Sequence, residues 1–224
     1  MLRPRRRITR REIKEDALVT FYVKVQKFFQ KHTRQLNIGM IVALVVVVVS
    51  FMMIRSKKSA ENTADARMGV AEQFYYATDY TRAIQELDQI VNLYAGTNAA
   101  GRAVFFIANS YFAIGDIPNA EKYFRMYLDD YSKDALFIVS SMAGIAACLE
   151  YQDQFLQAAQ MYEKAWNRQP DSFDAPFHLK DAGRCYIAAG SKEKGKEMYR
   201  LILDKYPESS INQDVSFLIS TLSP

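Results

Sequence analysis

The stretch FAIGDIPNAEKYFRMYL, residues 112–128, contains the pattern that decides the fold. Gly115 and Asp116 interrupt the chain, and an amphipathic run follows in which Ala120 stands four positions before Phe124. The same small-to-large pair recurs at intervals of 37, 38 and 37 residues, as Ala83/Leu87, Ala120/Phe124, Ala158/Tyr162 and Gly195/Tyr199. A fixed interval of this length indicates a stacked array of repeated units rather than a single loop.

The residues before each pair repeat at the same interval. Ala108 and Tyr111 precede Ala120, and Gly183 and Tyr186 precede Gly195. The pattern predicts two antiparallel helices per unit, in which small residues let the backbones approach and large ones fill the space against the next unit. One unit cannot bury its apolar face alone, so neighbouring units stabilise one another.

These positions resemble the tetratricopeptide repeat, L-G-x2-Y…A-x3-F…P, over about residues 64–208. The sequence departs from that family in its longer interval, in the loss of the leading Trp, and in the first unit, which has Ala95 where proline would stand. The resemblance implies an all-α solenoid of about four helix pairs. A further apolar stripe predicts a terminal cap helix in residues 209–224, through Ile211, Val215, Leu218, Ile219 and Leu222.

Residues 38–54, IGMIVALVVVVVSFMMI, predict a single transmembrane helix. They contain no charged side chain, and at 1.5 Å per residue they extend over about 26 Å, the short end of a membrane span. A cleaved signal peptide is disfavoured because the preceding charged segment, residues 1–37, is too long and Arg55-Ser56-Lys57-Lys58 follows in place of a cleavage site. Residues 55–63 are interpreted as a juxtamembrane link.

The charge distribution predicts the orientation. Residues 1–37 contain eleven Lys and Arg residues, whereas only Arg55, Lys57, Lys58 and Arg67 follow the span within twenty residues. We therefore expect the chain to cross the cell inner membrane once. The positive-inside rule places its N-terminus in the cytoplasm and the repeats on the extracytoplasmic side.

The basic arm, residues 1–37, predicts an amphipathic helix. Thr9-Arg10-Arg11-Glu12 matches a capping box, and the apolar residues from Leu18 to Phe29 fall at helical spacing. A basic amphipathic helix beside a span is typical of contact with anionic lipid; docking of a cytoplasmic partner is the alternative, and nucleic-acid binding is disfavoured because no recognised module is present. The residues expected to face lipid are Phe21, Tyr22, Phe28, Phe29, Lys24, Lys27 and Lys31.

The tetratricopeptide resemblance also implies a concave groove, lined by the first helix of each unit, that binds a protein segment. Lys180 and Arg184 share one helix face there and suit an acidic segment or a C-terminal carboxylate; pairing with Glu150 or Asp181 inside the array is the equal alternative. The family's groove positions correspond to Met68, Glu72, Tyr75, Tyr76, Arg102, Phe105, Asn109, Phe112, Glu150, Tyr151, Phe177, Lys180, Arg184 and Ile187.

No catalytic constellation is recognisable. His32 and His178 lie in different parts of the chain, and the sequence contains no Gly-rich phosphate loop and no His/Cys cluster with metal-ligand spacing. We expect no enzymatic activity, no cofactor, no metal and no small-molecule substrate. Cys148 and Cys185 hold equivalent positions in adjacent units, so we expect two buried free thiols.

Two functions remain open at this level. In the first, the chain is a non-catalytic membrane-anchored scaffold that binds partner proteins through its groove, similar to bacterial ancillary proteins of the translocation and envelope-chaperone kind. In the second, it is a permanent accessory subunit of a larger membrane complex, respiratory or photosynthetic, that docks a peripheral protein.

Overall fold

The computed structural model describes the backbone of residues 10–222 and the side chains of residues 19–35 and 37–222. Every regular element in that part of the chain is a helix, so the all-α prediction is confirmed. The chain divides into two units, residues 1–56 and 57–224. The helices are α1 (Arg10–Tyr76), α2 (Tyr80–Leu93), α3 (Asn98–Ala113), α4 (Ile117–Asp130), α5 (Ala135–Tyr151), α6 (Phe155–Arg168), α7 (Ala175–Ala188), α8 (Lys192–Lys205) and α9 (Asn212–Leu222).

The first unit consists of the N-terminal part of α1. Its helix is broken at His32, whose φ of −111° and ψ of 15° are not helical, and the Thr33 hydroxyl donates a hydrogen bond to the Phe29 carbonyl, 2.7 Å away. Beyond this break, the large apolar side chains of residues 38–54 are 48–70 % exposed. The segment Asn37–Tyr76 includes an 18-residue window with a mean hydropathy of 2.7 and no buried residue, long and apolar enough to cross a membrane. The described residues do not include Thr9 or the arginines of residues 3–9. They also do not include the side chains of the rest of the predicted capping box or of Leu18.

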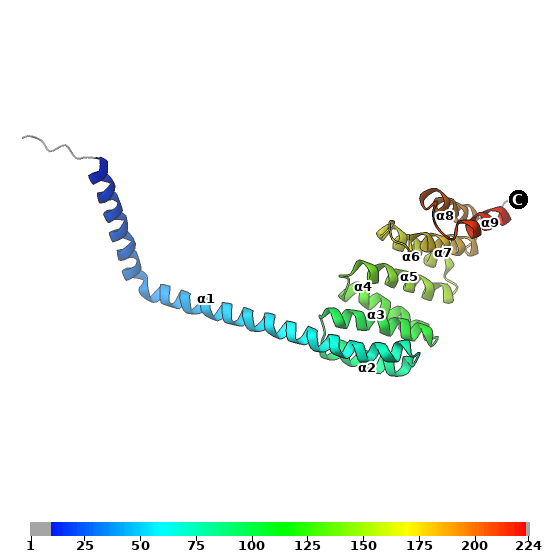
Figure 1. Ribbon diagram of the computed structural model, residues 1–224, viewed down its shortest axis with the longest axis horizontal. Coiled ribbons are helices and arrows are strands. Elements are labelled where there is room, and N and C mark those ends of the chain that lie inside the picture. Colours follow the sequence, from blue (N-terminus) through cyan, green and yellow to red (C-terminus); the bar gives the residue numbers. More distant parts are fainter. Residues whose placement is uncertain (1–9, 223–224) are drawn as a thin grey trace, which may run out of the picture. The chain divides into compact units, whose positions relative to one another are not determined.

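The second unit contains the repeats. The C-terminal part of α1 pairs with α2, and α3/α4, α5/α6 and α7/α8 follow as three further helix pairs that stack in chain order, with α9 after them (Figure 1). Residues 55–63, interpreted from the sequence as a link, are helical and belong to α1. The four-repeat solenoid with a terminal helix is therefore the architecture that the sequence interval predicts.

The turn inside each repeat uses one residue in the left-handed region. Gly115 and Gly190 have φ of 80° and 82°, as expected for a residue without Cβ, but the equivalent residues of repeats 1 and 3 are Thr78 (φ 60°) and Asp153 (φ 58°). In the same turn of repeat 2, Asp116 accepts a hydrogen bond from the Asn119 backbone amide and so caps α4. Each repeat thus reverses direction within a few residues and brings its two helices side by side.

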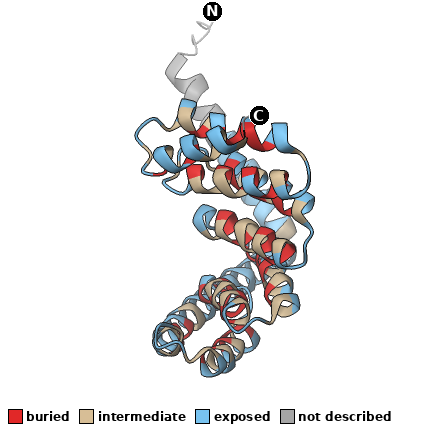
Figure 2. Ribbon diagram, turned by 90° about the vertical axis from the view of Figure 1, so that its right-hand side faces the viewer, coloured by how far each residue is buried: buried red, intermediate tan, exposed pale blue. Residues whose placement is uncertain are grey.

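Small residues set the distance between helices, as the sequence pattern requires. A Cβ built on Gly195 would lie 2.7 Å from the carbonyl oxygen of Gly183, so the two helices of repeat 4 touch backbone to backbone. A Cβ on Gly144 of α5 would lie 2.4 Å from the Phe124 ring, which fills the space between repeats 2 and 3. Ala120 and Phe124 are both buried. Figure 2 shows the buried residues along the faces where helices meet; burial of one large apolar side chain stabilises the fold by about 1.5–3 kcal/mol.

Candidate protein-binding surface

The predicted groove residues lie on the first helices of the four repeats, which are the C-terminal part of α1, α3, α5 and α7. We call this surface the first-helix face. Met68 does not belong to it, because its side chain is 1 % exposed and packs in a core cluster with Leu87 and Val104. The prediction for Met68 is therefore wrong. Met68 is buried because α3 packs closely across α1 beside it, where Arg102 of α3 pairs with Asp65 of α1 at 2.7 Å.

Phe105 also serves mainly to join repeats. Its half-buried ring lies 4.9 Å from the Phe137 ring, 6.0 Å from Phe124 and 6.3 Å from Tyr127, measured between centroids. These rings come from α3, α4 and α5. Phe105 therefore packs between three helices and is only partly exposed to a partner.

The charged members of the first-helix face have partners within the array. Arg184 pairs with Glu150 of the preceding repeat and with Asp181 of its own helix, the latter at 3.2 Å. Its hydrogen bonds to Glu150 raise the pKa of Arg184 above its usual value. Lys180 pairs with Asp214 of α9 at 3.4 Å. Arg184 thus has the pairing with Glu150 and Asp181 that was the alternative to partner binding, whereas Lys180 pairs with the terminal helix instead.

Two carboxylates that the sequence reasoning missed hold repeats 1 and 2 together. Glu61 accepts hydrogen bonds from the backbone amides of Asn98 and Ala99, at 2.9 and 3.0 Å, and thereby satisfies two donors at the start of α3. Asp65 binds Arg102. The interval itself was an available signal, because Asp65 and Arg102 stand 37 residues apart and occupy the same position in successive repeats.

Exposed aromatic side chains remain on the first-helix face. Tyr76 is 71 % exposed and Tyr151 is 70 % exposed, and they occupy equivalent positions in repeats 1 and 3. The Phe112 ring lies 5.4 Å from the Tyr151 ring in an edge-to-face arrangement. Exposed aromatic residues fixed by neighbouring rings provide contact area for a partner with little loss of side-chain freedom.

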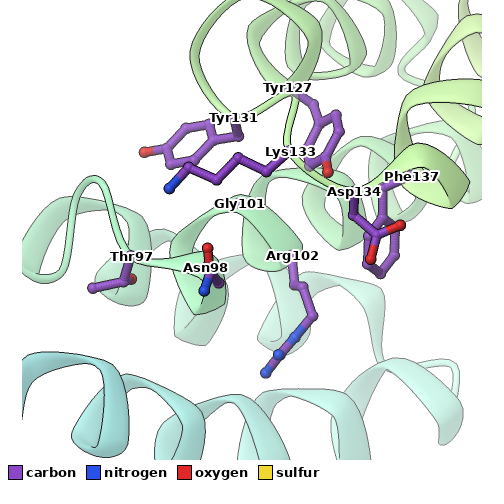
Figure 3. A pocket seen from close by; sticks show the side chains of 9 residues that line it. All are labelled: Thr97, Asn98, Gly101, Arg102, Tyr127, Tyr131, Lys133, Asp134 and Phe137. Atoms are coloured by element: carbon purple, nitrogen blue, oxygen red, sulfur yellow. The ribbon is translucent and has the colours of Figure 1, made fainter. Parts of the chain in front are cut away.

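A pocket of about 320 Å³ lies between repeats 2 and 3 (Figure 3). Tyr127 and Tyr131 lie on one side, and Arg102 extends away from them toward α1. Because Arg102 is already paired with Asp65, the pocket does not offer a free guanidinium. The lining residues are Thr97, Asn98, Gly101, Arg102, Tyr127, Tyr131, Lys133, Asp134 and Phe137.

Repeat 4 has a pocket at the equivalent place, about 450 Å³ in volume. Tyr206 replaces Tyr131, but Phe173 and Phe177 stand where repeat 2 has Asn98 and Arg102. Their rings are 6.0 Å apart, and Phe173 is 84 % exposed. The same location is therefore polar in repeat 2 and apolar in repeat 4.

The two cysteines are buried free thiols. Burial raises the pKa of Cys148 and of Cys185 to about 12, so neither forms a thiolate near neutral pH. No group of three or more His, Cys, Asp or Glu side chains in the described residues could hold a metal ion. The thiols are therefore packing residues.

The N-terminal part of α1 presents its aromatic and basic side chains to the surroundings. Phe21, Tyr22, Phe28 and Phe29 are all exposed. Lys24, Lys27 and Lys31 are exposed as well. The Phe28 and His32 rings lie 4.8 Å apart beside the helix break.

Comparisons with known proteins agree with this architecture. The family model "Tetratricopeptide repeat-like domain" matches residues 26–223. A MamA crystal structure is 14 % identical with a TM-score of 0.56, over 67 % of this chain and 77 % of that one. A MamA RS-1 double mutant is 17 % identical with a TM-score of 0.57, over 71 % and 88 %. A putative kinesin light chain of Podosopora anserina with TPR-like repeats is 13 % identical with a TM-score of 0.56, over 67 % and 77 %. No curated protein matched the chain.

Proposed function

The chain belongs to the tetratricopeptide repeat-like domain family, and we propose that it is a non-catalytic adaptor that holds partner proteins at a membrane. Repeats of this kind generally mediate protein–protein interaction. The observation that carries the membrane assignment is the exposure of every large apolar side chain in residues 38–54, on the same chain as a well-packed array. The first-helix face, with Tyr76, Phe112 and Tyr151, is the proposed binding surface.

Lipid is the environment that such a segment requires. In water, a contiguous apolar surface of this size would drive association with other chains. In a bilayer, its helical backbone satisfies its own hydrogen bonds and its Val, Ile, Leu and Phe side chains favour insertion. We therefore propose that residues 38–54 anchor the chain in a membrane.

Charge supports an orientation with the arm in the cytoplasm and the repeats on the opposite side of a bacterial inner membrane. Residues 17–60 contain no Asp or Glu, and eleven Lys and Arg residues precede residue 38. Exposed lysines beside exposed aromatic rings suit the headgroup region of an anionic leaflet, where each cation contributes about 1 kcal/mol. The break at His32 lies within this basic arm, before the apolar segment begins.

The proposed function is tested with the full chain expressed in its native host. Membranes are washed with carbonate, extracted with mild detergent, crosslinked and separated by size. An adaptor remains in the membrane fraction and co-purifies with partner proteins in substoichiometric amounts. Quantitative co-elution with one large complex would instead support a permanent accessory subunit. Recovery in the wash, free of any partner, would contradict both functions.

A further inference from the structure

Four aromatic rings gather at the end of α1. Between ring centroids, Tyr75 lies 5.4 Å from Tyr76, 5.7 Å from Tyr80 and 4.9 Å from Phe106. Each of these pairs is edge-to-face. Tyr76 also contacts Phe106 at 6.4 Å, yet it remains 71 % exposed. We call these four residues, together with Glu72, the Tyr76 cluster. Tyr76 therefore packs against two rings of the cluster and leaves most of its surface exposed.

Glu72 gives the cluster a negative charge. It stands one turn before Tyr76, on the same side of α1, because residues four apart share a helix face. Its side chain is half-buried, and it has no ion pair or hydrogen bond with any described residue, whereas nearby Asp79 is paired with Arg82. The carbonyl end of α1 adds partial negative charge at the same place. A cation is the complementary ligand, since both the faces of aromatic rings and a carboxylate attract it.

A related arrangement occurs two repeats later. Tyr151 occupies the position of Tyr76, it packs against Phe112, and the exposed Asp153 follows it. The equivalent residue in repeat 2 is Ala113, which is exposed and has only a methyl side chain. Neighbouring packed helices lie about 8–10 Å apart, so two steps along the stack, from the repeat of Tyr76 to that of Tyr151, correspond to about 18 Å. At about 3.3 Å per residue, an extended chain crosses that distance in about five or six residues.

The charge of the whole second unit favours the same ligand. Residues 57–224 contain 22 Asp and Glu residues against 17 Lys and Arg residues. The two arginines of the first-helix face are already paired. Arg102 pairs with Asp65, and Arg184 pairs with Glu150. Long-range attraction and the local site therefore both select a basic partner.

We propose that the Tyr76 cluster binds an arginine or lysine side chain from an extended basic segment of a partner protein, and that Tyr151 binds a second cation five or six residues along that segment. The proposal rests on the proposed adaptor function and names the chemistry of its partner. Two anchors on one face distinguish a protein segment from a lone amine, because linking two weak contacts raises their combined affinity.

The test uses the full chain in nanodiscs of neutral lipid, so that the basic peptide is not attracted to the lipid surface. The probe is a fluorescent Gly/Ser/Pro peptide with two arginines separated by five residues; matched peptides have two glutamates, one arginine, or two adjacent arginines. Fluorescence anisotropy reports each Kd. We expect the spaced two-arginine peptide to bind most tightly and the glutamate peptide not to bind.

Variants locate the binding. Tyr76→Ala is expected to weaken the two-arginine peptide about fivefold, as for one cation–π contact, while Tyr76→Phe retains the ring and the affinity. Glu72→Gln should weaken binding and reduce its dependence on salt. Phe217→Ala is the matched control, because Phe217 is an exposed aromatic residue on α9.

The proposal is overturned if the arginine peptide does not bind, if it binds no better than the glutamate peptide, or if Tyr76→Ala and Phe217→Ala have the same Kd. Equal affinity for the adjacent and spaced arginines would overturn the role of Tyr151. These failures are distinguishable from failure of the adaptor function, because an adaptor for a different kind of segment would still remain in membranes and co-purify with its partner.

Discussion

Residues 38–54 and the repeat array use the same apolar side chains in opposite ways. Val46 and its neighbours in the first unit are exposed, whereas Val104 and Ile107 in the array are fully buried. The array buries its apolar residues because each helix pair has another pair beside it. In the first unit, none of the large apolar side chains of residues 38–54, all of which the structure describes, is buried. Apolar composition therefore identifies a segment that must be covered, and the surrounding structure decides whether protein or lipid covers it.

The largest expected effect comes from arginine in the apolar segment. Each arginine near the centre of a membrane helix costs about 2.5–3.5 kcal/mol, so Val46→Arg with Val47→Arg should abolish retention in carbonate-washed membranes. Val104→Arg, at a buried position of the array, should unfold the repeats and leave membrane retention intact. Leu93→Arg, at an exposed position of α2, should change neither. Retention of the Val46/Val47 variant would remove the contrast between the two regions.

A smaller effect tests close packing in the array. Gly195→Ala should lower the free energy of unfolding by about 1–3 kcal/mol, because the new methyl would meet the backbone oxygen of Gly183. Gly69→Ala is the control: a Cβ there meets nothing within 4 Å, so better helix propensity should raise stability by up to about 1 kcal/mol. Urea denaturation of both variants measures the difference. Equal midpoints would show that the helices of repeat 4 are farther apart than described.

The turns of repeats 1 and 2 provide a comparison within the array. Gly115→Thr places a β-branched residue at a φ of 80° and should lower the free energy of unfolding by about 1–2 kcal/mol. Thr78→Gly should change it less, because relief of strain is offset by the greater freedom of glycine in the unfolded chain. Thermal unfolding of the two variants measures both. A Gly115→Thr variant that melts with the parent would show that this turn relaxes without cost.

A further effect appears only at alkaline pH. Burial raises the pKa of Cys148 and Cys185 to about 12, against about 8.5 in an unfolded chain. Between these values the folded chain retains protons that the unfolded chain releases, so the stability contributed by the neutral thiols is complete below about pH 8.5 and is lost as pH rises toward 12. A Cys148→Ala/Cys185→Ala variant should show a shallower fall of unfolding free energy between pH 8.5 and 11. Identical slopes would mean that the thiols are not shielded from water.

The repeat positions could be predicted from the sequence because close packing demands small and large side chains at fixed intervals. The packing roles of Gly195 and Phe124 follow from the size of their side chains, and each lies where two helices touch. The helical nature of residues 55–63 could also have been predicted, since the chain contains no proline between Pro4 and Pro118 to end α1.

The partners of charged residues could not be predicted in the same way. Lys180 meets Asp214 and Arg184 meets Glu150 across separate helices, and these pairs depend on how the helices are rotated and displaced. Met68 occupies a groove position by repeat register, but what covers it depends on the way α3 crosses α1. The exposed rings of Tyr76 and Tyr151 lie on the proposed surface. Their neighbours Phe106 and Phe112 come from a helix that is distant in sequence.

Accessibility of cysteines on either side of the apolar segment tests most directly whether the chain crosses a membrane. In a Cys148→Ala/Cys185→Ala background, Gln26→Cys and Ser210→Cys each provide one thiol at an exposed position. Intact cells are treated with a membrane-impermeant maleimide before and after permeabilisation. We expect that Ser210→Cys is labelled in intact cells and that Gln26→Cys is labelled only after permeabilisation. Equal labelling of the two positions in intact cells would contradict a membrane-crossing anchor between them.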